Sequence, residues 1–151
     1  MVTLVPLTTE DGYVLEQIHA ASFPDGWTRE TFDHLLTENQ TCGWMATSVD
    51  ETPLGFILAR VVADEAEILT FAVHPSSQGQ GLGRYLIMEL MNFLKSVRCM
   101  KIFLEVALDN RAAIDLYTSV GFKCVGTRPN YYQRNAQTFI SASVMAFEDR
   151  R

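Results

Sequence analysis

The spacing of apolar residues changes around a glycine-rich segment in the middle of the chain. Before it, residues 68–73 form a largely apolar, β-prone run of strand length. The segments 74–77 and 78–83 that follow are rich in turn-forming residues and glycine. Beyond them, apolar residues recur at helical spacing, at Leu82, Leu86, Leu90, Phe93 and Val97. The pattern predicts a strand, a glycine-rich turn and a helix that begins at or within the glycines.

The first 62 residues predict a short strand, two helices and a β-hairpin. We expect a strand over residues 2–7, and then a helix that Pro24 ends. Thr28 is a plausible N-cap for a second helix that runs through Glu38. The β-prone segments 43–49 and 54–62 flank a polar turn and predict a hairpin.

The C-terminal third predicts a strand, a short helix and a second hairpin. Residues 101–106 are nearly all apolar, as expected for a strand covered on both faces. Asn110 or Asp109 would cap a helix that Gly121 ends. Segments 122–131 and 138–147 would form the final hairpin. We therefore expect one α/β domain over residues 1–151, with a mixed, mostly antiparallel central sheet of about seven strands flanked by about four helices.

Composition narrows the class of protein. The apolar content of 48%, the charged content of 20% and the net charge of −6 are ordinary for a globular protein and argue against broad electrostatic binding to nucleic acid. Three cysteines without a C-x-x-C pair, and three scattered histidines, predict neither a disulfide framework nor a metal site. Cys42 and Cys124 fall in strand-like segments, where we expect buried thiols.

Targeting signals are also missing from the pattern. No apolar run approaches the ~20 residues of a membrane helix, so we expect no membrane partner. Met1 leads directly into a strand pattern, without a basic segment or an apolar signal core. The expectation is a cytoplasmic protein; its oligomeric state is open.

A strand, a glycine-rich turn and a helix together suit a phosphate ligand. The start of a helix leaves backbone N–H groups unpaired, and glycines let a ligand approach the main chain. Only Arg84 adds a formal positive charge. A Rossmann fingerprint is absent, because the sixth position is Arg84 when counted from Gly79 and Leu86 when counted from Gly81. The Gly-Lys-Ser/Thr ending of a Walker A loop is absent too.

The segment Gln78-x-x-Gly81-x-Gly83, after a strand that ends in Val73-His74-Pro75, resembles motif A of the GCN5-related N-acetyltransferases (GNAT superfamily). The alternative is an ordinary glycine-rich turn. The resemblance implies the GNAT fold, acetyl-CoA as co-substrate without a metal, and a binding site for its diphosphate at the glycines.

Two residues could carry acetyl transfer to an amine, which needs a proton acceptor and a proton donor. Glu105 interrupts an apolar strand, where an unpaired carboxylate would be costly and would act as a base. Alternatively, it sits at the wet end of the strand and pairs with a cation. Tyr117 could protonate a thiolate, or it could simply pack on the core through its helix.

The resemblance extends along almost the whole chain to the bacterial RimI-type protein N-α-acetyltransferases. It implies that Glu105 is the proton acceptor and Tyr117 the donor. Residues implied to bind acetyl-CoA, largely through the main chain, are Phe71, Ala72, Val73, Gln78, Gly79, Gln80, Gly81, Leu82, Gly83, Arg84 and Asn110. Residues implied to border the acceptor are Phe23, Trp27, Tyr131 and Tyr132; packing of Phe23 and Trp27 on the core, and of the tyrosines within the hairpin, is the alternative.

The implied acceptor is a protein or peptide N-terminus, that of a ribosomal small-subunit protein in this group. The chain departs from the group at residues 133–138, where the usual acid after a Gly/Asp-rich turn is missing. This departure bears on which N-terminus is modified and leaves the cofactor prediction intact. Two other functions stay open: acetylation of a small amine, such as a polyamine or an amino sugar, and a non-catalytic CoA-binding module.

Overall fold

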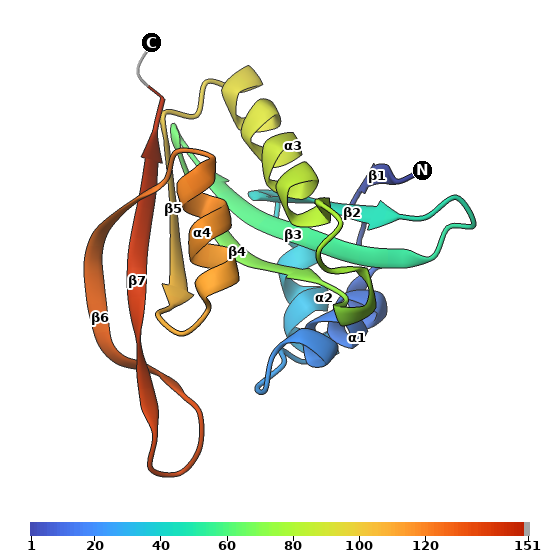
Figure 1. The fold of residues 1–151 in the computed structure, drawn as a ribbon. Helices are drawn as coiled ribbons and strands as arrows, with labels where there is room; N and C mark the ends of the chain where they lie inside the picture. The colour runs from blue at the N-terminus through green and yellow to red at the C-terminus, as the bar shows by residue number, and fades with distance from the viewer. Residues whose placement is uncertain (150–151) are drawn as a thin grey trace.

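A computed structural model describes residues 1–149. Seven strands in these residues form one sheet in the order β1-β2-β3-β4-β5-β7-β6, with four α-helices packed around it (Figure 1). The elements are β1 (Thr3–Pro6), α1 (Gly12–Ser22), α2 (Arg29–Thr37), β2 (Thr41–Thr47), β3 (Pro53–Val62), β4 (Glu65–Val73), a 3-10 turn (Pro75–Ser77), α3 (Leu82–Ser96), β5 (Lys101–Ala107), α4 (Arg111–Ser119), β6 (Lys123–Gln133) and β7 (Phe139–Glu148).

The sheet separates in its middle. Neighbouring strands are antiparallel except β4 and β5, which run parallel and pair only from Glu65 to Glu67 against Lys101 to Phe103. Leu69 is an extra residue in β4, because Thr70 pairs with Leu58 and Ile68 with Ala59. Such a bulge bends a strand. Beyond it β4 and β5 diverge, and a gap opens between them (Figure 1). The predicted mixed, mostly antiparallel α/β architecture is confirmed.

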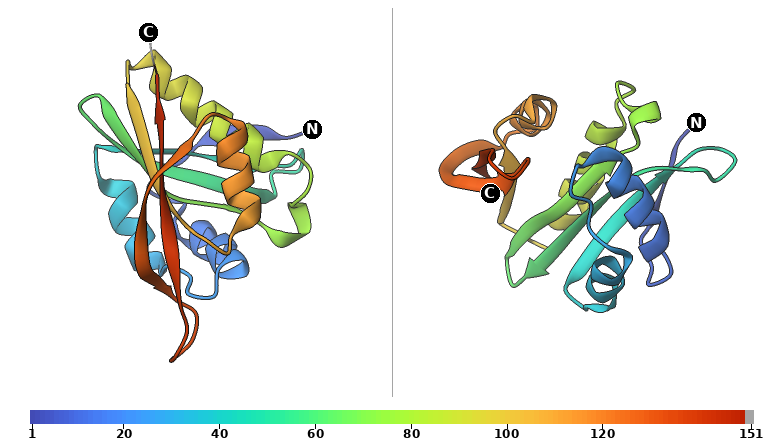
Figure 2. Two further views of the ribbon diagram at one scale, coloured as in Figure 1. Left: turned by 60° about the vertical axis from the view of Figure 1, so that its left-hand side comes forward. Right: turned by 90° about the horizontal axis from the view of Figure 1, so that it is seen from below.

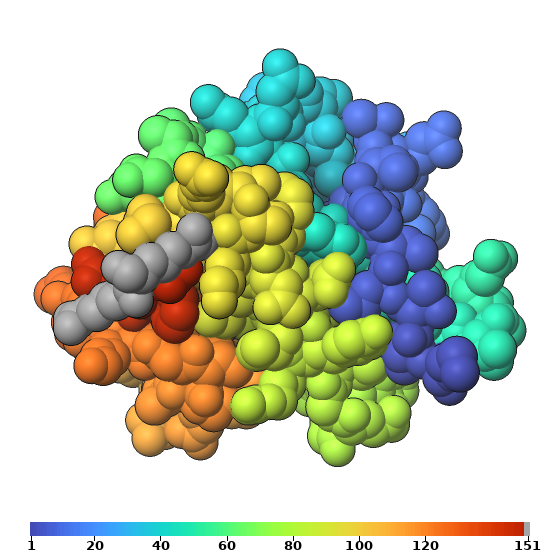
Figure 3. Space-filling model, turned by 90° about the horizontal axis from the view of Figure 1, so that it is seen from above, coloured from blue at the N-terminus to red at the C-terminus, as the bar shows by residue number. Residues whose placement is uncertain are grey.

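The helices cover the two faces of the sheet in pairs (Figure 2). Helices α3 and α4 pack on one face, where Leu86, Leu90 and Tyr117 join the larger core cluster. Helices α1 and α2 pack on the other face, where Leu15 and Phe32 meet side chains from β2, β3 and β4. In the space-filling view, α3 lies across its face of the molecule between α4 and the N-terminal residues (Figure 3). No helix within residues 1–149 is long and apolar enough to cross a membrane.

Strand β5 corrects one expectation. Its residues alternate in burial: Ile102, Leu104 and Val106 are buried, whereas Phe103 and Glu105 are only partly buried. The prediction of two covered faces was wrong because the core beneath α1 and α2 is built on β2, β3 and β4 and stops short of β5. Glu105 is therefore on the face of β5 that α1 and α2 leave uncovered.

Three further expectations were wrong in detail. Strand β6 is the edge of the sheet and is exposed along nearly its whole length, so Cys124 is exposed, while Cys42 in β2 is only half-buried. Helix α3 ends at Ser96, so Val97 lies beyond it and is exposed, and Leu94 takes its place in the core. Strand β6 also runs two residues past the predicted Tyr131, to Gln133.

Candidate active site

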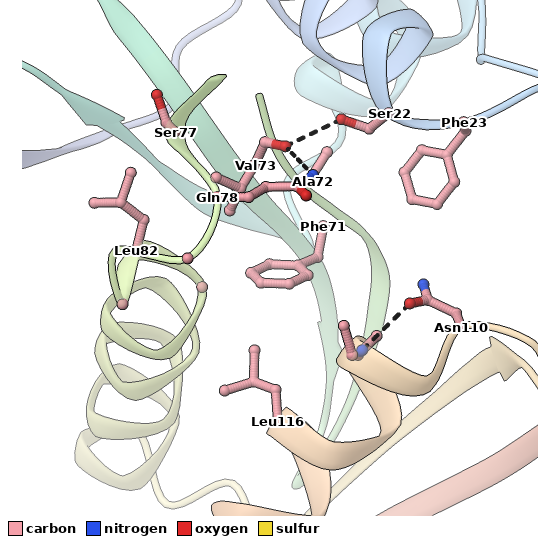
Figure 4. A pocket seen from close by; sticks show the side chains of 15 residues that line it. Ser22, Phe23, Phe71, Ala72, Val73, Ser77, Gln78, Leu82, Asn110 and Leu116 are labelled. Atoms are coloured by element: carbon pink, nitrogen blue, oxygen red, sulfur yellow. Dashed lines mark hydrogen bonds between the residues drawn. The ribbon is translucent and has the colours of Figure 1, made fainter. Parts of the chain in front are cut away.

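A cavity of about 340 Å³ lies between the end of β4 and the starts of α3 and α4, with the end of α1 on one side (Figure 4). This volume is within the range of small-molecule sites. All of the residues predicted to bind the cofactor line it except Gln80 and Arg84. Phe23 lines it as well. Lining residues that the sequence did not single out are Ser22, Ser77, Ala112, Ala113 and Leu116.

The glycine turn is shaped by backbone conformation. Gly79 and Gly81 have φ angles of 78° and 81°, in the left-handed region that other residues enter at a cost of about 1–2 kcal/mol. A Cβ on either glycine would meet no atom within 4 Å, so conformation, and not crowding, requires glycine here. The first helical bond runs from the Tyr85 N–H to the Gly81 carbonyl. The amides of residues 82–84 therefore have no partner within α3, beside the cavity.

Gly83 is needed for a different reason. It lies inside α3 with an ordinary helical backbone, but a Cβ there would lie 3.0 Å from Phe71 Cζ and 3.1 Å from Leu116 Cδ2. Both side chains line the cavity, one from β4 and one from α4 (Figure 4). The missing side chain lets α3, α4 and β4 approach one another at the cavity.

The carbonyl of Val73 joins three of these elements. It accepts hydrogen bonds from Ser22 Oγ at 3.2 Å and from Gln78 Nε2 at 3.1 Å (Figure 4). These two bonds tie the end of α1 and the glycine turn to the end of β4. On the opposite wall, Asn110 Oδ1 accepts from the Ala113 N–H at 3.2 Å, which confirms Asn110 as the N-cap of α4. Asn110 thus both caps the helix and lines the cavity.

Tyr117 lies behind the cavity. Its ring is almost fully buried and packs on Phe71 and Phe122, with ring centroids 6.1 and 5.6 Å apart. Burial, with a smaller contribution from Tyr132, raises the pKa of the Tyr117 phenol well above its usual value. The packing expected of a helix tyrosine is therefore present, and the phenol stays protonated at neutral pH.

Glu105 is neither isolated nor fully solvated. Its side chain is 23% exposed, and its Oε1 lies 3.0 Å from Nε of Arg128 on β6. The same carboxylate is close enough to Tyr131 to help raise the pKa of its phenol. The hydroxyl of Tyr132 donates to the Glu105 backbone carbonyl at 3.4 Å. The pairing of Glu105 with a cation is thus present, and sequence reasoning had not singled out its partner Arg128.

A bulge in β6 brings the two tyrosines to Glu105. The pairing of β6 with β7 is interrupted between Arg128 and Tyr132, and Asn130 has a left-handed φ of 52°. The Asn130 N–H donates to Ser141 Oγ at 3.3 Å, which holds the bulge in place. Bulges turn side chains out of the regular alternation of a strand. Burial raises the pKa of Tyr132 to about 12, and burial and Glu105 both raise that of Tyr131.

The segment between α1 and α2 is built around His19. The backbone N–H of Trp27 donates to His19 Nδ1 at 3.0 Å, so Nδ1 is the unprotonated nitrogen and Nε2–H donates to Thr70 Oγ1 at 2.9 Å. Burial lowers the pKa of His19 to about 4. Its ring contacts those of Phe23 and Trp27. Phe23 reaches the cavity wall, and Trp27 packs on the core of α1 and α2, as the stapling interpretation predicted.

The β6–β7 turn, where the sequence departs from the RimI-type pattern, is fastened by another ion pair. Arg134 donates two hydrogen bonds to Asp109, at 2.8 and 3.0 Å, and its guanidinium lies 5.6 Å from the centre of the Tyr132 ring. Asp109 belongs to the β5–α4 connection, directly before Asn110. This turn and the α1–α2 connection lie at the same end of the molecule (Figure 1 and Figure 2).

Comparison with known proteins agrees with this geometry. The sequence model of the acetyltransferase (GNAT) family matches residues 13–122. A [ribosomal protein bS18]-alanine N-acetyltransferase of Salmonella typhimurium is 34% identical over 146 residues, which are 97% of each chain. The N-alpha-acetyltransferase RimI of Mycobacterium tuberculosis is 35% identical over 138 residues, covering 87% of this chain and 85% of the other. The crystal structure of the ribosomal-protein-S18-alanine N-acetyltransferase from Escherichia coli superimposes with a TM-score of 0.91 at 32% identity, covering 98% of this chain and 94% of that one.

Proposed function

The chain belongs to the acetyltransferase (GNAT) family, and on this premise we propose that it transfers the acetyl group of acetyl-CoA to the α-amine of a protein N-terminus. The observation that carries the proposal is the start of α3. Gly79 and Gly81 have left-handed backbones there, and the unpaired amides of residues 82–84 lie beside the cavity. Similarity to N-terminal acetyltransferases over nearly the whole chain supports the choice of acceptor.

The residues around the cavity fit acetyl-CoA. A cofactor diphosphate needs hydrogen-bond donors and a partial positive charge, which the amides of residues 82–84 and the dipole of α3 supply without a lysine. The groove between β4 and α4 would hold the pantetheine arm along Phe71, Ala72 and Val73, with Asn110 opposite. The Arg84 guanidinium donates to Ser119 Oγ at 3.0 Å, so we assign its backbone N–H, and not its side chain, to the diphosphate. Bound acetyl-CoA supplies an activated thioester.

The two groups that would transfer protons are Glu105 on β5 and Tyr117 on α4. Glu105 would take the proton of the acceptor amine, since its partly exposed carboxylate is on the face that the acceptor can reach. Tyr117 would give a proton to the departing thiolate. A general acid must hold its proton beforehand; a phenol does so at neutral pH, and burial moves the pKa of Tyr117 further above its ordinary value.

The acceptor would enter between the α1–α2 connection and the β6–β7 turn. Phe23 and Trp27 would border it from one side, and Tyr131 and Tyr132 from the other. The relatives named for alanine of ribosomal protein bS18 make the N-terminus of that small-subunit protein our first candidate substrate. We place the reaction in the cytoplasm, where ribosomal proteins are made.

The test is incubation of the protein with labelled acetyl-CoA and a library of peptides with free N-termini, followed by mass spectrometry of the products. Acetylation of free but not blocked N-termini is expected. Acetylation of spermidine or an amino sugar in preference to every peptide would identify a small-amine enzyme. Tight CoA binding without turnover of any amine would identify a non-catalytic CoA-binding module.

A further inference from the structure

The carboxylate assigned as the base is already held by a cation. Arg128 Nε lies 3.0 Å from Glu105 Oε1. The guanidinium also lies over the Tyr131 ring, 5.0 Å from its centre. An acceptor ammonium that pairs with Glu105 Oε1 would therefore displace a group of the same charge.

The two partners differ in how firmly they are held. Glu105 is on an interior strand of the sheet with a side chain 23% exposed, whereas Arg128 is on the edge strand with a side chain 57% exposed. A partly buried carboxylate is costly to leave unpaired, but an exposed arginine can turn into water. The cation can thus be exchanged while the carboxylate stays in place.

We propose that the Arg128 guanidinium occupies the position of the acceptor ammonium and is exchanged for it when the acceptor binds. This inference rests on the proposed function and on Glu105 as its base. An α-amine has a pKa of about 7.7–8.0, so an acceptor arrives mainly as a cation at neutral pH. Exchange of one cation for the other never leaves Glu105 unpaired. Arg128 is then a specificity-determining residue, because a neutral nucleophile would have to separate the pair without replacing it.

The exchange has a measurable cost. When only a fraction of molecules has Arg128 turned away, the apparent affinity for the acceptor falls by that fraction. Exposed ion pairs of this kind shift such an equilibrium by about two- to five-fold. Removal of the guanidinium should tighten acceptor binding by that factor. If Arg128 instead oriented Glu105 or bound the peptide, removal of its guanidinium would weaken acceptor binding.

The experiment compares Arg128→Ala and Arg128→Lys with the parent enzyme, using a free-amine peptide that the parent acetylates. We measure kcat, KM for the peptide and for acetyl-CoA, and peptide Kd on the enzyme–CoA complex. Arg128→Ala should lower the peptide KM and Kd about two- to five-fold, with kcat and the acetyl-CoA KM unchanged. Arg128→Lys keeps a cation and should stay near the parent. Arg60→Ala, which removes the Arg60–Glu38 pair at the far end of β3, is the matched control and should change none of these values.

Added methylguanidinium gives an independent readout. It should compete with the peptide in Arg128→Ala at a lower concentration than in the parent enzyme, because the vacated position then accepts it. An unchanged or raised peptide KM in Arg128→Ala, or a lower kcat, would overturn the exchange while the parent enzyme stays active. A parent enzyme that acetylates no free amine would overturn the proposed function, and the exchange with it.

Discussion

Gly83 and Phe71 lie so close that a single added methyl group would bring them to 3.0 Å, the distance from an ideal Gly83 Cβ to Phe71 Cζ. One residue belongs to α3 and the other to β4, and both line the cavity proposed for acetyl-CoA. These two elements flank the proposed diphosphate and pantetheine positions. A side chain at position 83 would therefore crowd the cavity wall.

Gly83→Ala should weaken CoA binding about ten-fold or more. The added methyl displaces the Phe71 ring or the Leu116 side chain, and such crowding typically costs about 1–3 kcal/mol. Calorimetry with CoA measures the loss. The control is Gly126→Ala on the exposed edge strand β6, where a Cβ would meet only Val144 at 4.0 Å. Equal CoA affinity in Gly83→Ala and the parent would show that the contact does not shape the site.

Gly81→Ala should destabilise the fold by about 1–2 kcal/mol through its left-handed backbone, although the site has space for a methyl group. Urea denaturation measures the difference. Relaxation of the turn away from the left-handed region would also move the first amides of α3, so weaker CoA binding should accompany the loss. A variant as stable as the parent would contradict the assigned strain.

Tyr117→Phe should lower kcat by roughly 10²–10⁴-fold and leave CoA affinity nearly unchanged. The substitution removes the hydroxyl while keeping the ring that packs on Phe71 and Phe122. Steady-state kinetics and calorimetry separate the two effects. Tyr85→Phe, on the exposed side of α3, is the control. A Tyr117→Phe variant that turns over at the parent rate would remove Tyr117 from the mechanism.

Protonation of His19 should weaken the fold as the pH falls below about 6.5. The pKa of His19 is about 4 in the folded protein and near 6.5 in the unfolded chain, so the unfolded state binds more protons between these values. Stability is therefore full above pH 6.5 and is lost progressively toward pH 4. The loss at pH 5 should be on the order of 1–2 kcal/mol.

Urea denaturation at pH 7 and pH 5 measures this loss. His19→Gln should be less stable than the parent at pH 7, because Trp27 and Thr70 lose their partner, but its stability should depend less on pH. An equal pH dependence in His19→Gln and the parent would assign the effect to other groups.

The ion pair between Arg134 and Asp109 should couple the β6–β7 turn to the β5–α4 connection. Each single substitution to alanine should cost at most about 1 kcal/mol, because both side chains are partly exposed. A double-mutant cycle in urea should give a coupling energy of about 0.5–1 kcal/mol. A coupling energy near zero would show that the bidentate contact adds nothing to the fold.

We also expect a few-fold higher peptide KM in Arg134→Ala, because Tyr132 loses the guanidinium stacked on its ring.

Prediction from sequence was accurate where a local pattern determines the outcome. Apolar spacing placed α3, Thr28 was the predicted cap of α2, and Asn110 was one of the two predicted caps of α4. In each of these cases the deciding interaction lies within a few residues of the chain. The resemblance to a family then predicted residues in four separate segments that line the cavity.

Prediction was wrong or silent where contacts between distant segments decide. The apolar composition of β5 predicted two covered faces, but helices α1 and α2 stop short of it. The exposure of Cys124 follows from the position of β6 at the edge of the sheet, which its own sequence does not reveal. Arg128 had no local signal either, because its partner Glu105 is in another strand.

The sequence by itself therefore determined most of the elements, the glycine-rich turn and the two candidate proton-transfer residues, because these depend on local backbone preferences and residue chemistry. Only the tertiary structure decided the divergence of β4 and β5, the closeness of Gly83 to Phe71, and the pairing of Glu105 with Arg128. The physical reason is that sheet order and bulges place side chains from distant segments next to one another. No spacing along the chain encodes those distances.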